Sequence, residues 1–158
     1  MQQKVSQLTD KERAWIAVQI EGASMFVNAF SPTDAGQPLT LAALDRAFAA
    51  WLGAQATDNE LDNAAINCVG VAFGQLLVEG VGLAWVIASD KNGSDLAVYG
   101  LPGKGDVLVY PANFVAKRWE RRETNFLETS YKQIAEQVQA LARNNATKAT
   151  GKAWWKFW

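Results

Sequence analysis

The 158-residue chain carries 15 Lys and Arg against 16 Asp and Glu, contains no histidine, and has a single cysteine, Cys68. This length fits one domain with its own core, and 49% apolar with 20% charged residues is typical of globular proteins. One cysteine excludes an internal disulfide framework, and a zinc site is not expected without histidine. We find no signal-peptide pattern and no apolar run long enough to span a bilayer, so we expect a cytoplasmic protein without a transmembrane segment.

Two helices open the predicted fold. Thr9-Asp10-Lys11-Glu12 is a capping box, in which the Thr9 hydroxyl and the Glu12 carboxylate are placed to accept hydrogen bonds from free backbone N–H groups. The helix that follows ends at Ser31-Pro32, and apolar residues at helical spacing predict its core face: Trp15, Val18, Gly22, Met25, Phe26 and Ala29. Thr40 is predicted to cap a second helix that ends near Gly53.

A third helix is predicted from a second capping box, Thr57 to Glu60, to about Gly80. Gly70 and Gly74 lie four residues apart on it, so they share one face and leave that face bare. Interior glycines lower helix stability by about 1 kcal/mol each relative to alanine. We therefore expect another part of the chain to pack closely against this face, and we expect Cys68 to be a buried core residue, not a reactive thiol.

Three antiparallel strands are predicted to follow. Asn92-Gly93 is the strongest hairpin signal in the sequence, because both residues tolerate the positive φ of a type I′ turn. This turn places Trp85 opposite Gly100, where the indole would cover the bare backbone. Asp106 to Tyr110 completes the meander.

Two helices and an aromatic tail end the chain. Pro111 suits the first turn of a short helix, and a last helix is predicted from about Asn125 to Arg143. The polar stretch from Asn144 to Lys152 is predicted to be a linker before Trp154, Trp155, Phe157 and Trp158. We therefore predict a single α+β domain over residues 1–143, with three N-terminal helices, a three-stranded antiparallel meander and two C-terminal helices, followed by a linker and tail over residues 144–158.

Glycine-rich and aromatic motifs recur in a fixed order through the centre of the chain: Gly70–Gly74 (GVAFG), Gly82–Val86 (GLAWV), the polar turn Asp90–Ser94, Val107–Pro111 (VLVYP) and Lys117-Arg118. From residue 67 to about residue 138 the sequence thereby resembles a bacterial family of small proteins described only as a domain of unknown function. The resemblance implies a small cytoplasmic α+β protein and supplies no catalytic residues. Analogy with related small bacterial domains further implies an immunity protein that neutralises a cognate toxin.

No catalytic set is recognised in the sequence. Histidine is absent, and no Gly-x-Ser-x-Gly motif is present. The glycines between Gly100 and Gly105 lack the Gly-Lys-Ser/Thr ending of a phosphate loop and lead into a strand. We therefore expect no enzymatic activity, no cofactor and no metal.

Three groups of residues are candidates for binding a partner. The acidic residues Glu79, Asp90 and Asp95 could gather at one end of the hairpin, although solvated turn carboxylates are the interpretation we favour. Arg118, Arg121 and Arg122 belong to the basic run 117–122, which begins with Lys117 and includes Trp119, and we favour a solvated helix face over a nucleic-acid interface. The tail residues Trp154, Trp155, Phe157 and Trp158 form the third group; we expect them to dock on this domain or on a second copy, with a membrane interface as the alternative.

Charge is distributed unevenly along the chain. Residues 1–110 hold 6 basic against 12 acidic residues, a net charge of −6, whereas residues 111–158 hold 9 against 4, a net charge of +5. This polarity favours a charged partner or an internal pairing of the two halves. We expect a non-enzymatic cytoplasmic binding protein, most concretely an immunity protein that blocks a toxin. The alternatives are a housekeeping or regulatory interaction domain and, third, an unrecognised enzyme.

Overall fold

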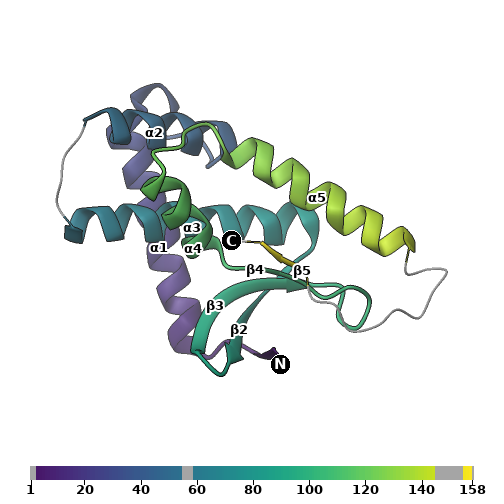
Figure 1. Ribbon diagram of the computed structural model, residues 1–158. Coiled ribbons are helices and arrows are strands. Elements are labelled where there is room, and N and C mark those ends of the chain that lie inside the picture. The colour runs from purple at the N-terminus through teal and green to yellow at the C-terminus, as the bar shows by residue number, and fades with distance from the viewer. Residues whose placement is uncertain (1–2, 55–58, 145–154, 158) are drawn as a thin grey trace.

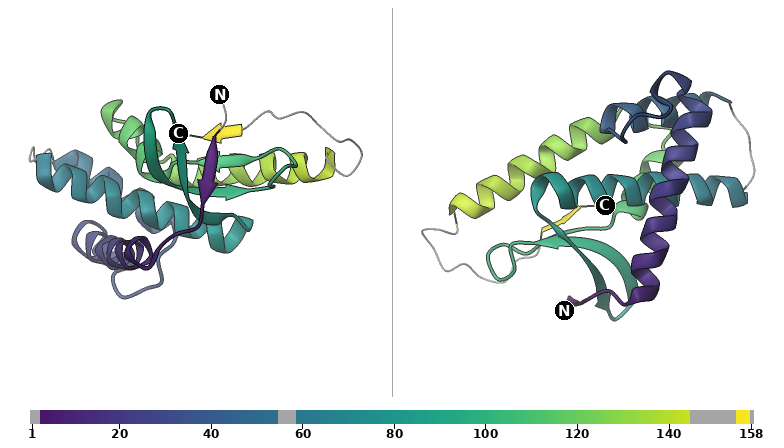
Figure 2. Two further views of the ribbon diagram at one scale, coloured as in Figure 1. Left: turned by 90° about the horizontal axis from the view of Figure 1, so that it is seen from below. Right: turned by 180° about the vertical axis from the view of Figure 1, so that it is seen from behind.

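The computed structural model describes residues 3–54, 59–144 and 155–157, and it shows an α+β fold (Figure 1). Its helices are α1 (Asp10–Phe30), α2 (Leu41–Ala54), α3 (Asn59–Val81), α4 (Pro111–Glu120) and α5 (Leu127–Asn144), with a short 3-10 turn, η1 (Pro32–Asp34). Its strands are β1 (Lys4–Ser6), β2 (Ala84–Asp90), β3 (Gly93–Gly100), β4 (Val107–Val109) and β5 (Trp155–Phe157). Helices α1, α2 and α3 lie together on one side of the sheet (Figure 2).

The sheet is larger than the predicted meander. Its strand order is β1-β2-β3-β4-β5, in which β1 to β4 are antiparallel and β5 pairs in parallel with β4. The prediction of three strands is therefore wrong in number. Both added strands have three residues, a length too short for an alternating apolar pattern to be recognised.

The hairpin between β2 and β3 turns one residue earlier than predicted. Asp90 pairs with Gly93, so Lys91 and Asn92 form the turn, and neither has a positive φ. Gly93 instead takes φ +133°, and the Asp90 carboxylate accepts a hydrogen bond from the Asn92 N–H at 2.7 Å. The carboxylate thus stabilises a turn that the Asn-Gly rule does not consider.

This change moves the cross-strand partners by two residues. Trp85 lies opposite Val98, not Gly100 as predicted. A shift of two leaves each side chain on its predicted face, because strand side chains alternate with a period of two. Gly100 is covered by Leu83, whose Cδ2 lies 2.4 Å from the position that a Cβ would occupy.

The bare face of α3 is filled as expected. A Cβ on Gly70 would lie 2.6 Å from the Ala112 Cα of α4, and a Cβ on Gly74 would lie 2.5 Å from Cη2 of Trp85. The two glycines therefore allow α4 and the indole to approach α3 closely. Cys68, on the same helix, is buried, and burial raises the pKa of its thiol to about 11, which fits a core residue.

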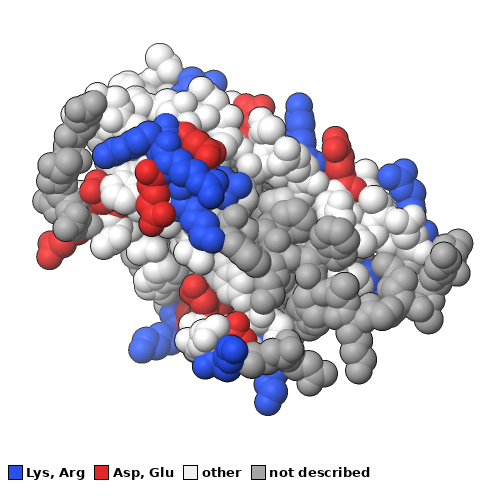
Figure 3. Space-filling view, viewed as in Figure 1, with Lys and Arg blue, Asp and Glu red and all other residues white. Residues whose placement is uncertain are grey.

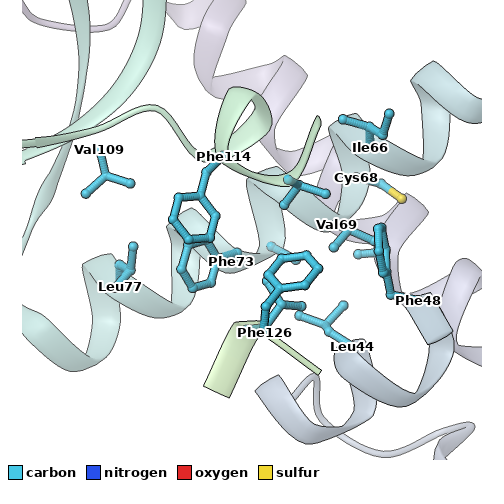
Figure 4. Close-up of a cluster of buried hydrophobic side chains, with 14 of the residues drawn as sticks. Leu44, Phe48, Ile66, Cys68, Val69, Phe73, Leu77, Val109, Phe114 and Phe126 are labelled. Atoms are coloured by element: carbon cyan, nitrogen blue, oxygen red, sulfur yellow. The ribbon is translucent and has the colours of Figure 1, made fainter. Parts of the chain in front are cut away.

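Aromatic rings connect the helices in the core (Figure 4). Phe73 of α3 stacks on Phe114 of α4 with ring centroids 5.3 Å apart. Phe48 of α2 meets Phe126, which precedes α5, edge to face at the same centroid distance. This cluster fixes α4 beside the sheet and so determines where its polar face lies.

The predicted core face of α1 is correct for Phe26, which is buried, and wrong for the other large apolar residues assigned to it. Trp15, Val18 and Met25 are 40%, 61% and 70% exposed, whereas Ile16 and Ala23 are buried. Apolar side chains occur on both faces of this helix, so helical spacing alone does not decide which face is inside.

The predicted N-terminal cap is confirmed for α2 but not for α1. Thr40 Oγ1 accepts the Ala43 N–H at 3.1 Å, as expected for the cap of α2. The Thr9 hydroxyl instead donates to the Glu12 carboxylate and makes no cap bond to the backbone of α1. Thr57 and Asp58 of the other predicted capping box lie outside the described residues.

The expectation that no apolar run is long enough to span a bilayer is wrong for helix α3, whereas the absence of a transmembrane segment stays a prediction. Its residues Glu60–Val81 are long and apolar enough to cross a bilayer by length and composition. The buried core helix of a globular protein can be equally long and apolar. In α3, 56% of the most apolar stretch is buried within the molecule.

Candidate functional site

A polar cavity of about 330 Å³ lies where the end of the β2–β3 hairpin approaches α4. We call it the hairpin-tip pocket; its lining residues come from β2, the turn, β3, the start of α4 and the residue before it: Ala88, Asp90, Asn92, Gly93, Ser94, Asp95, Tyr110, Asn113 and Lys117. On this side of the molecule, acidic atoms gather below a cluster of basic atoms that lies over α4 (Figure 3).

Two carboxylates supply the negative charge of the pocket. Asp90 Oδ1 accepts the Asn92 N–H at 2.7 Å, and Asp95 Oδ1 accepts the Leu96 N–H at 2.8 Å. Each carboxylate is therefore oriented by the backbone through one oxygen. The second oxygen of each has no hydrogen-bond partner among the described residues, so it can accept a bond from a ligand.

Tyr110 lines the pocket together with the two carboxylates and is also hydrogen-bonded to Gln3, the residue before β1. Burial raises the pKa of its hydroxyl, and the charges of Asp90 and Asp95 raise it further, whereas a hydrogen bond with Gln3 lowers it. Gln3 is itself buried, and its Nε2 donates to the Ser89 carbonyl at 3.1 Å. Gln3 thus helps to position Tyr110, which remains a neutral hydroxyl at physiological pH.

Helix α4 supplies the opposite wall. Asn113 and Lys117 lie four residues apart, so they share the face that looks toward the hairpin. Two carboxylates and one ammonium therefore face the same cavity. Asp90 and Asp95 are candidates from the sequence, and Lys117 belongs to the predicted basic run, but Tyr110 and Asn113 are not predicted. The four-residue spacing of Asn113 and Lys117 is the one sequence signal that could have joined these two residues.

Glu79 does not join the other two acids. Its Oε1 accepts a hydrogen bond from Gln75 Nε2 at 3.0 Å, and Gln75 Oε1 in turn accepts the indole N–H of Trp85 at 2.9 Å. Glu79 lines a separate cavity of about 310 Å³ between α1, α3 and the loop that follows η1. The expectation that three acidic residues meet at one end of the hairpin therefore fails for Glu79.

The basic run on and after α4 is divided by its contacts. The Arg118 guanidinium lies 3.6 Å from the centroid of the Phe114 ring, and burial lowers its pKa. After the end of α4, Arg121 pairs with Glu123 at 3.7 Å, and the Arg122 guanidinium lies 5.6 Å from the centroid of the Trp119 ring. Each arginine thus has a contact within residues 114–123, and none of the three is among the described residues that line the hairpin-tip pocket.

The aromatic tail is described only in part. The backbone of β5 pairs Trp155 with Val107 and Phe157 with Val109. Trp154 and Trp158 lie outside the described residues, as do the side chains of β5. The docking of the aromatic side chains stays a prediction.

A family model described as a domain of unknown function matches residues 49–131, which is more than half of the chain. The resemblance expected over residues 67–138 is thereby confirmed, although the match begins earlier, in α2, and ends in α5. It includes every residue that lines the hairpin-tip pocket. No curated protein and no solved structure matches the chain.

Proposed function

The chain belongs to the family described as a domain of unknown function (DUF3806), and for this member we propose a non-enzymatic binding protein. In this proposal the hairpin-tip pocket holds a positively charged side chain of a protein partner. The observation that carries it is the convergence of Asp90, Asp95 and the Tyr110 hydroxyl on one cavity.

Charge and size support a basic side chain as the ligand. Among the described residues that line the pocket, two carboxylates against the ammonium of Lys117 give a net negative charge. A guanidinium presents several N–H donors, which match the carboxylate oxygens that face the cavity. A volume of about 330 Å³ lies at the small end for ligand pockets, which suits one side chain better than a large cofactor.

The polar groups of the pocket favour binding over chemistry. With a raised pKa, Tyr110 donates or accepts hydrogen bonds but is not a ready base. The Ser94 hydroxyl is hydrogen-bonded to the Ser89 hydroxyl at 2.8 Å, and a serine hydroxyl is not a base that would activate it.

The affinity for N-acetyl-arginine amide, followed by ligand-observed NMR, tests this proposal. Asp90→Asn together with Asp95→Asn should weaken binding by about tenfold or more, because hydrogen bonds to charged groups contribute about 1.5–3 kcal/mol. N-acetyl-citrulline amide, which has a similar shape without the charge, should bind the unchanged protein about as weakly. Asp10→Asn, which removes an exposed carboxylate from α1, is the matched control. Equal binding by the double variant and this control would exclude the pocket.

The narrower proposal, an immunity protein, adds a toxin as the partner. A net-negative pocket suits a toxin with a basic surface, since charge complementarity raises the association rate. Co-expression with a toxin encoded beside this gene should restore growth, and Asp90→Asn with Asp95→Asn should reduce that rescue. If growth is not restored by the unchanged protein or by the double variant, the immunity proposal is rejected. The general proposal of a binding protein would not be affected.

A further inference from the structure

Besides the hairpin-tip pocket, a cavity of about 310 Å³ lies between α1, α3 and the loop 35–40 that follows η1. We call it the α1–α3 cavity. Helices α1 and α3 cross (Figures 1 and 2), and they are in contact at Gly22, where a Cβ would lie 3.4 Å from the Cβ of Cys68. The cavity lies beside this contact, where Ala72, one turn further along α3, leaves space because its side chain is small.

Most of the residues that line the α1–α3 cavity are apolar. They come from α1, the loop and α3: Ile20, Pro38, Leu39, Ala72 and Leu76. The loop is anchored at both ends, because Asp34 accepts hydrogen bonds from the Arg46 side chain at 2.8 and 2.9 Å and Thr40 caps α2. The walls are therefore formed without a ligand, and they would bury an apolar group that enters.

Three polar residues also line the cavity: Ser24, Gln75 and Glu79. The Trp85 indole N–H can only donate, and it donates to Gln75 Oε1 at 2.9 Å. The Gln75 Nε2 is thereby directed to Glu79, whose Oε1 accepts its hydrogen bond at 3.0 Å. A hydrogen-bonded chain from β2 thus orients the Glu79 carboxylate at the cavity. Its Oε2 has no hydrogen-bond partner among the described residues, so it can accept a bond from a ligand.

Charge and size indicate the class of ligand. Among the described residues that line the cavity, Glu79 alone carries a charge, so the cavity favours a cation over an anion. An ammonium group has three N–H donors, one of which can bond to Glu79 Oε2. A volume of about 310 Å³ is at the lower end for ligand pockets, which fits one ring or a short alkyl chain. We propose that the α1–α3 cavity binds a small primary amine with an apolar body, whose ammonium group bonds to Glu79.

The affinity for 2-phenylethylamine, followed by protein-observed NMR, tests this site. The side-chain signals of Gln75 and Trp85 should move, because hydrogen bonds connect both groups to Glu79. Glu79→Gln should weaken binding about fivefold, a modest loss because Glu79 is exposed to water. The unchanged protein should bind 2-phenylethanol, which has a similar shape without the charge, as weakly as the variant binds the amine.

Glu136→Gln, which removes an exposed carboxylate from α5, is the matched control for the charge and should bind the amine as the unchanged protein does. No saturable shift up to about 10 mM amine, or equal binding by the Glu79 and Glu136 variants, would overturn the proposal.

Ser24→Trp tests the location of the amine. Ser24 is exposed, so the larger side chain takes up space in the cavity without a change in the core. Binding should be lost, whereas Ala17→Trp, at an exposed position of α1 outside the cavity lining, should have no effect. Asp90→Asn with Asp95→Asn, which neutralises the hairpin-tip pocket, should also leave binding unchanged. If that double variant lost binding and Ser24→Trp kept it, the amine would belong to the hairpin-tip pocket and the proposal would be wrong.

Discussion

Gly70→Ala is expected to lower the free energy of unfolding by about 2–3 kcal/mol, although alanine is the better helix former. A Cβ at this position would lie 2.6 Å from the Ala112 Cα, 2.9 Å from the Ala112 N and 3.0 Å from the Pro111 carbonyl oxygen. All three are backbone atoms, so no side-chain rotation relieves the contact. Helix α4 must shift away from α3, and urea unfolding followed by circular dichroism would measure the loss.

Gly53→Ala is the control, and its expected effect has the opposite sign. Gly53 lies near the end of α2, and nothing lies within 4 Å of the position of its Cβ. The substitution should raise stability by about 0.5–1 kcal/mol through helix propensity alone. If the two alanine variants proved equally stable, close packing at Gly70 would not explain that glycine.

Asp45→Ala is expected to lower the free energy of unfolding by about 2–3 kcal/mol, measured in the same way. Asp45 of α2 is buried, and its two carboxylate oxygens accept the Leu127 N–H at 2.9 Å and the Glu128 N–H at 3.1 Å. These N–H groups lie at the start of α5, where the helix's own carbonyls supply no partner, so Asp45 caps α5 from α2. Removing the carboxylate leaves a buried donor without a partner.

Asp45→Asn separates this cap from the charge. Its single amide oxygen keeps one of the two bonds, so it should lose about half as much stability. Burial raises the pKa of Asp45 above the 3.8 of a free carboxyl, although the backbone bonds oppose this. The folded protein therefore holds the proton more tightly than the unfolded chain. The stability of the unchanged protein relative to Asp45→Asn should fall as pH rises from 3.8 through the raised pKa, then stay constant; a rise with pH would contradict this assignment.

Features with a local cause could be predicted from the sequence. The spacing of Gly70 and Gly74 depends on one helix alone, and it correctly predicted close packing. Thr40 caps α2 through the Ala43 N–H, three residues away. The order of the five helices and the three central strands follows from such signals.

Features that depend on distant partners could not be predicted. The start of α5 was placed at Asn125, but this residue has φ +57°, and the helix begins at Leu127 because Asp45, 82 residues earlier, caps it. The core face of α1 was misassigned because Val18 and Ile16, on opposite faces, are equally apolar, and only the position of α3 decides between them. The added strands depend on pairing with residues far along the chain.

In the candidate site, too, residues with a local signal could be predicted and residues brought in by distant packing could not. Asp90 and Asp95 were selected because they flank a hairpin turn, and the turn does bring them to one cavity. Tyr110 and Lys117 line the opposite side of that cavity. Their positions depend on how α4 packs on α3. A hydrophobic cluster thus determines which polar groups meet the hairpin.

Protein-observed NMR with added N-acetyl-arginine amide tests the central claim, a pocket for a basic side chain, most directly. The amide signals that move should be those of residues 88–95 and 110–117, the two segments that line the cavity. The same signals should stay in place when N-acetyl-citrulline amide is added. Shifts elsewhere on the protein, or the same shifts with both compounds, would contradict a negatively charged site at the tip of the hairpin.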